Sequence, residues 1–74
     1  MNIEEVTQLV QTSIPNAEVS VTGEGCNFSI TVISAQFRNM SLVQRQRLVM
    51  APFKERISSG ELHALSVKAL TPED

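Results

Sequence analysis

The pattern of residues 62–72, LHALSVKALTP, constrains the fold more than any other part of the chain. Side chains alternate between the two faces of an extended strand, and here one face is mainly apolar while the other is mainly polar. The apolar face takes His63, Leu65, Val67 and Ala69, and the polar face takes Ala64, Ser66 and Lys68. We therefore predict a strand packed on a core, with the only histidine of the chain at its start.

A helix and two more strands are predicted before it. Residues 2–13 repeat apolar side chains at helical spacing and carry acids in the first turn, where the helix dipole favours them. Residues 18–22 and 28–34 alternate with a period of two and are joined by the glycine-containing segment GEGCN, residues 23–27. Two such runs are typical of an antiparallel hairpin.

A helix pair is predicted between the hairpin and the last strand. Ser41 followed by Gln44 is a capping-box pattern, and the helix that it starts runs to Pro52. Because proline fits the first turn of a helix, a second, short helix is expected from this proline onward. Gly60 suits the left-handed residue that ends it. The side chains expected to turn inward on the short helix are Phe53 and Ile57.

The order helix, strand, strand, helix, helix, strand predicts an α+β fold in one domain over residues 1–74, with a three-stranded mixed sheet. A strand that leaves through helices and returns to the same sheet in parallel makes a right-handed crossover in nearly all cases. If the last strand lies parallel to the second, both begin at the same edge. We expect this topology to bring Cys26 and His63, which precede those two strands, to one edge of the sheet.

Length and composition favour a small soluble domain. The 74 residues are 42% hydrophobic and 19% charged, as in compact globular chains. The N-terminal residues carry acids where a secretory signal carries bases, and the single cysteine cannot form an internal disulfide, so we expect a cytoplasmic protein without membrane contact. A core of this size contributes only ~3–5 kcal/mol, and we expect a monomer or a weak homodimer.

The basic residues are concentrated in residues 38–56, which hold five of them against one acid and carry a net charge of +4. Such a segment can contact phosphates or an acidic partner, and it can equally be a solvated helix face. The predicted order of elements also matches one version of the KH-like fold. KH domains bind nucleic acid through a GxxG clamp between two helices, and this chain has VMAP, residues 49–52, at that place. The candidate DNA-contacting residues of this basic segment are Arg38, Arg45, Arg47, Lys54 and Arg56.

Cys26 and His63 are the candidate metal ligands, because thiolates and imidazoles suit soft and borderline metals. Structural zinc sites and iron–sulfur clusters generally need four ligands, so a site built on these two residues would be shared with another chain. The alternatives are a cysteine that packs as a small hydrophobe and a structural histidine. A Cys–His nucleophilic pair lacks an evident orienting group, and we expect no enzymatic activity.

Three segments resemble the BolA-like family, and especially its short bacterial branch, IbaG. They are GEGCNFSITVIS, FRNMSLVQRQRLVMAPF and LHALSVKALTP, so the similarity runs nearly end to end. Asn27 stands where some relatives carry histidine, and Met50 replaces an aromatic residue. The resemblance implies the αββααβ form of the KH-like fold (class II). The most specific positions are Phe37, Met40–Ser41, the Arg45 region and His63–Ala64.

The resemblance also implies a partner, a monothiol glutaredoxin, and a two-iron two-sulfur cluster that the two proteins share. The glutaredoxin cysteine and glutathione bind the cluster on one side. On the other side, the family's C-terminal histidine ligand corresponds to His63, and its hairpin-loop ligand corresponds to Cys26. No cofactor is expected in the isolated chain. Members resembling BolA itself are linked to transcriptional control and stress responses, which makes DNA binding the alternative function.

Overall fold

The computed structural model describes residues 2–24, 27–60, 62 and 64–73, without the side chains of Glu24 and Ala64. Its helices and strands follow the predicted αββααβ order, with two added single turns of 3₁₀ helix, η1 and η2. The elements are α1 (Ile3–Ser13), β1 (Glu18–Glu24), β2 (Asn27–Ile33), η1 (Ala35–Phe37), α2 (Leu42–Met50), η2 (Ala51–Phe53), α3 (Lys54–Ser58) and β3 (Ala64–Leu70).

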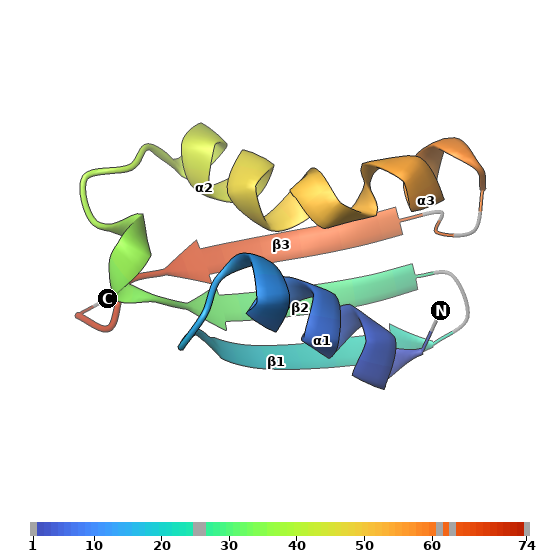
Figure 1. Cartoon of the computed structure of the whole chain (residues 1–74), viewed down its shortest axis with the longest axis horizontal. Coiled ribbons are helices and arrows are strands. Elements are labelled where there is room, and N and C mark those ends of the chain that lie inside the picture. Colours follow the sequence, from blue (N-terminus) through green and yellow to red (C-terminus); the bar gives the residue numbers. More distant parts are fainter. Residues whose placement is uncertain (1, 25–26, 61, 63, 74) are drawn as a thin grey trace.

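β2 is the central strand of a mixed sheet with the order β1-β2-β3. It pairs antiparallel with β1, with Glu18 opposite Ile33 and Val21 opposite Ile30. It pairs parallel with β3, with Asn27 opposite Ala64. Figure 1 shows α1 in front of β1 and β2, while α2 and α3 run alongside β3. The predicted hairpin and the predicted parallel return of the last strand are both confirmed.

The core lies between the helices and one face of the sheet. Phe28, Ile30 and Val32 alternate with the exposed Ser29 along β2, so a single face of this strand is buried. On β3, Ala69 is buried while Ser66 and Lys68 are exposed, which confirms the predicted faces for these residues. The helical and loop segments contribute Val6, Val10, Ile14, Phe37, Val49, Phe53 and Leu62 to the same cluster.

The two longer helices both begin with side-chain caps, and the one at α2 was predicted. The Asn2 side chain accepts a hydrogen bond from the Glu5 backbone N–H at 2.9 Å and caps α1. At the start of α2 the Ser41 hydroxyl accepts a hydrogen bond from the Gln44 backbone N–H at 3.1 Å, and the Gln44 Oε1 accepts one from the Ser41 backbone N–H at 3.0 Å. Together they form the predicted capping box. Each bond satisfies a backbone donor that the first helical turn leaves without a partner.

The second helix of the pair differs from its prediction. Pro52 lies within η2, and α3 begins only at Lys54. Phe53 is fully buried, as predicted, but Ile57 is 36% exposed, so its predicted inward position is wrong. The Phe53 backbone, with φ of −104° and ψ of −5°, departs from α-helical values, so the regular four-residue spacing that would set Ile57 on the face of Phe53 is interrupted there. Gly60 has φ of 84°, which confirms its left-handed conformation.

The hairpin strands reach further than predicted. β1 extends to Glu24 and β2 begins at Asn27, so most of the segment predicted as a connection is paired. Gly23 has φ of 129°, and a Cβ at this position would collide with the Asn27 carbonyl. Glycine is therefore required where the two strands approach each other. None of the described helices combines the length and the apolar character that a membrane span requires.

Candidate functional site

The starts of β2 and β3 lie side by side, and we call this place the β2–β3 rim. The parallel register pairs Asn27 with Ala64 and Phe28 with Leu65. Cys26 directly precedes Asn27 and His63 directly precedes Ala64 in the chain, but both lie outside the described residues. The predicted meeting of the two strand starts is confirmed, while the roles of Cys26 and His63 stay predictions.

Buried side chains hold the described chain on each side of this rim. Leu62 is fully buried, and its backbone N–H donates to the Arg56 carbonyl at 3.1 Å, which ties the approach to β3 to the end of α3. Phe28, one residue into β2, is 4% exposed. Asn27 itself is exposed. The rim therefore combines a fixed base with at least one solvent-facing position, which suits a contact with a partner.

No preformed metal site exists among the described residues, where no three His, Cys, Asp or Glu side chains gather. Cys26 and His63, the ligands predicted from the sequence, lie outside the described residues. The donor chemistry of a thiolate and an imidazole fits an iron–sulfur cluster, and two donors fall short of the four that such a cluster needs.

Arg45, one of the candidate DNA-contacting residues, has a structural role. Its Nε donates to the Met40 carbonyl and its Nη1 donates to the Ala69 carbonyl, both at 3.2 Å. The guanidinium also lies 6.0 Å from the centre of the Phe37 ring. This half-buried side chain therefore joins α2 to β3 and to the segment before α2, although the sequence alone presents it as surface charge.

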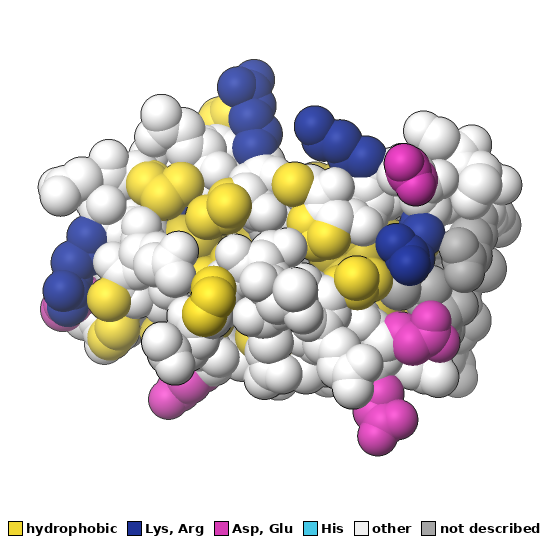
Figure 2. Space-filling view, viewed as in Figure 1, with side chains coloured by type: hydrophobic (Ala, Val, Ile, Leu, Met, Phe, Trp, Pro, Cys, Tyr) yellow, Lys and Arg dark blue, Asp and Glu magenta, His cyan; other side chains and the backbone are white. Residues whose placement is uncertain are grey.

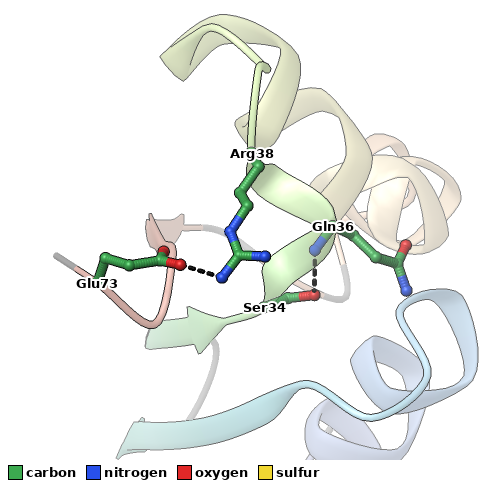
Figure 3. Close-up of polar contacts among 4 residues, drawn as sticks. All are labelled: Ser34, Gln36, Arg38 and Glu73. Atoms are coloured by element: carbon green, nitrogen blue, oxygen red, sulfur yellow. Dashed lines mark hydrogen bonds and ion pairs between the residues drawn. The ribbon is translucent and has the colours of Figure 1, made fainter.

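The side chain of Arg38, between η1 and α2, forms an ion pair with Glu73, which follows β3 (Figure 3). The hydrogen bond from Arg38 holds the pKa of Glu73 below its usual value, with further help from the residue's own backbone N–H. In the same view the Ser34 hydroxyl accepts a hydrogen bond from the Gln36 backbone N–H and caps η1. These contacts fix the segment that leads from β2 to α2.

The other three candidate basic residues lie on the helix pair. Arg56 is half-buried, and its Nη1 donates to the Pro52 carbonyl at 3.3 Å. Arg47 and Lys54 are exposed, on α2 and α3, and no hydrogen bond or ion pair joins either side chain to the described part of the chain. In Figure 2 dark-blue side chains project from the upper margin of the molecule, where α2 and α3 lie, and others lie at its left and right ends.

Sequence reasoning missed the anchoring role of Arg45, although a signal for it was present. Arg45 precedes Val49 by four residues, so the two share one face of α2, and Val49 is part of the core. The role of Glu73 had no such signal, because its partner Arg38 lies 35 residues away. Long-range pairs of this kind require the fold to be known.

Known proteins resemble this chain both in sequence and in structure. The family model described as BolA-like protein matches residues 2–74. An uncharacterised protein from the rpoN–murA intergenic region of Acinetobacter guillouiae is 38% identical over 74 residues, covering 100% of this chain and 89% of that protein. The acid stress protein IbaG of Escherichia coli K12 is 32% identical over 74 residues, covering 100% and 88%. The structure of BolA1 from Arabidopsis thaliana superposes with a TM-score of 0.82 at 27% identity, covering 96% and 92%.

The anchoring role of Arg45 predicts a stability effect that depends on its hydrogen bonds. Arg45→Met keeps most of the apolar stem but removes the donors to Met40 and Ala69, and we expect the free energy of unfolding to fall by about 1–2 kcal/mol. Arg47→Met, at an exposed position on the same helix, is the matched control and should change it by less than about 0.5 kcal/mol. Equal urea midpoints for the two variants would contradict the anchoring role.

The Arg38–Glu73 pair predicts a pH dependence of known sign. Because the folded pKa of Glu73 is lowered, the stabilisation from this carboxylate is present above its unfolded pKa and is lost as the pH falls through the folded pKa. Arg38→Gln should raise the Glu73 pKa towards its usual value, measured by NMR titration of the side-chain carbonyl. Arg47→Gln, the control, should leave the Glu73 pKa unchanged. A Glu73 pKa that is also unchanged in the Arg38→Gln variant would refute the pairing.

Proposed function

The chain belongs to the BolA-like family, and on this basis we propose that it partners a monothiol glutaredoxin and shares a two-iron two-sulfur cluster with it. Such a complex would act in iron–sulfur trafficking or sensing, and in stress response. His63 and Cys26 are the proposed ligands from this chain. The cluster is the cargo or signal of the complex, and the chain's own part is to bind and orient it.

One observation carries the proposal, the pairing of Asn27 with Ala64 at the β2–β3 rim. The parallel register sets the residues that follow Cys26 and His63 opposite each other, although 37 positions separate the two pairing residues in sequence. The anchored Leu62 adds support, because a fixed approach to β3 lowers the entropy cost of presenting a ligand to a partner.

The small number of proposed ligands favours a cluster site shared with a partner over a site formed by this chain alone. A cluster needs four donors, and the two proposed here would leave two places for the glutaredoxin cysteine and glutathione. A thiolate and a neutral imidazole also differ in charge and donor strength. Replacing either one should therefore change the optical spectrum of the cluster in its own way.

The proposal predicts that mixing this protein with a monothiol glutaredoxin, glutathione, iron and sulfide gives a visible circular dichroism spectrum distinct from that of glutaredoxin alone. His63→Ala and Cys26→Ser should each alter that spectrum, because each removes a ligand atom. Gln46→Ala, an exposed change on α2, serves as the control and should leave the spectrum as it is.

Two outcomes separate the parts of this proposal. A mixture that shows only the glutaredoxin spectrum, with no complex on a sizing column, would refute the partnership. A mixed cluster whose spectrum is indifferent to His63→Ala and Cys26→Ser would refute the ligand assignment alone.

DNA binding by the basic helix pair is the second candidate, favoured by the exposure of Arg47 and Lys54 on neighbouring helices. If these side chains contact phosphates, Arg47→Ala and Lys54→Ala should each reduce the slope of log K against log salt concentration by about one unit. Gln46→Ala is again the control. An unchanged slope in both variants would exclude this interface. Arg45→Ala is unsuitable for the test, because it removes a structural contact.

A further inference from the structure

β1 is an edge strand whose outer backbone groups have no partner strand. The sheet order places β1 beside β2 only, and β2 occupies a single side of it. No turn or loop bond in the described part of the chain reaches Val19 or Val21. Unpaired edges of this kind are templates for adding another strand.

The direction of these backbone groups follows from the register. The Ser34 N–H donates to the Leu70 carbonyl at 3.0 Å, so even-numbered residues of β2 and β3 turn their backbone groups towards each other. The odd-numbered residues of β2 consequently face β1, where Thr31 is opposite Ser20. By the same alternation, Val19 and Val21 turn their N–H and C=O groups away from β2, to the free edge.

The other edge of the sheet is treated differently. The Ala69 carbonyl of β3 faces outward and accepts the hydrogen bond from Arg45. α2 and α3 also follow this edge in Figure 1. Arg45 and the two helices therefore cover part of the β3 edge, while α1 packs against the face of β1.

The surroundings of the β1 edge suit an added strand. Val19 and Val21 are only half-buried on the core side, so a neighbour could cover them. In Figure 1 α1 lies in front of β1, and its first turn carries Ile3, which is 45% exposed. Side chains of an added strand on the core side would thus find apolar surface beside them.

The acidic residues near β1 favour an added strand of positive charge. Residues 2–37 contain the acids Glu4, Glu5, Glu18 and Glu24 and no lysine or arginine. In Figure 2 the lower margin of the molecule, where α1 and β1 lie, bears magenta side chains and no dark-blue ones. An added strand with basic residues would complement this charge, whereas an acidic strand or a nucleic acid would be repelled.

A second copy of the chain meets charge repulsion at this edge when the two β1 strands pair around Val21. An antiparallel β1–β1 pairing centred on Val21 would set Glu18 of each copy opposite Glu24 of the other. Like charges directly opposite each other destabilise a strand pair. This arrangement works against self-association through β1.

We propose that the outer edge of β1 is a docking site for an extended, basic segment of another protein, which adds a fourth strand to the sheet. The site uses Val19 and Val21 for backbone hydrogen bonds and Glu18 for charge pairing. It is independent of the β2–β3 rim and of the basic helix pair.

A designed peptide tests this proposal. Acetylated and amidated Lys-Val-Thr-Val-Thr-Val-Lys, aligned antiparallel to residues 18–24, sets a lysine opposite each of the two glutamates and valines on the core side. On titration of the isotope-labelled protein, the amides of Val19 and Val21 should shift and gain protection from hydrogen exchange. The amides of Ser20 and Thr22, already paired with β2, are the internal control.

Two substitutions and a second peptide complete the test. Glu18→Lys should weaken peptide binding about fivefold or more, while Glu55→Lys, the same charge change on α3, should leave it within about twofold. Glu18→Lys should also increase self-association, because it makes the β1–β1 register charge-complementary. The peptide with glutamates in place of its lysines should bind more weakly than the basic one.

Three results would overturn the proposal. They are peptide-induced shifts that centre away from β1, equal weakening by Glu18→Lys and Glu55→Lys, and self-association of the unsubstituted protein through β1.

Discussion

The parallel pairing of β2 with β3 is the constraint on which the rest of the structure depends. A parallel neighbour cannot be reached through a tight turn, because the chain must first return to the end of the sheet where β2 began. The helix pair α2–α3 makes this return and covers the core face on its way. The same pairing creates the β2–β3 rim, so the architecture and the candidate cluster site have one physical origin.

The two edges of the sheet show how a small domain distributes its polar groups. On the β3 side, an arginine donates to an outward-facing carbonyl and stacks near a buried aromatic ring. Its charge is thereby used inside the protein. On the β1 side the backbone remains open and the neighbouring side chains are acidic. A strand added beyond β1 would be separated from β3 by two strands, so different partners could use the two sides.

The charge pattern of the sequence becomes a spatial division in the fold. The basic segment 38–56 forms the helix pair, and the acidic N-terminal segment forms α1 and β1. However, Arg38 pairs with Glu73, and Arg45 and Arg56 donate to backbone carbonyls. The surface available to an anionic partner is therefore narrower than a net charge of +4 suggests, and it centres on Arg47 and Lys54.

The sequence by itself determined the order of elements, the hairpin, the capping box at Ser41 and the faces of β3, because these features follow from local periodicity and capping chemistry. It also predicted that the last strand lies parallel to the second, which the register confirms. Only the tertiary structure decided the exposure of Ile57, the anchoring role of Arg45, the Arg38–Glu73 pair and the open edge of β1. The Arg38–Glu73 pair and the open edge of β1 depend on which distant segments meet, and local sequence patterns do not record this. The face that Arg45 shares with Val49 was visible in the sequence, but the carbonyl of β3 that Arg45 binds was not.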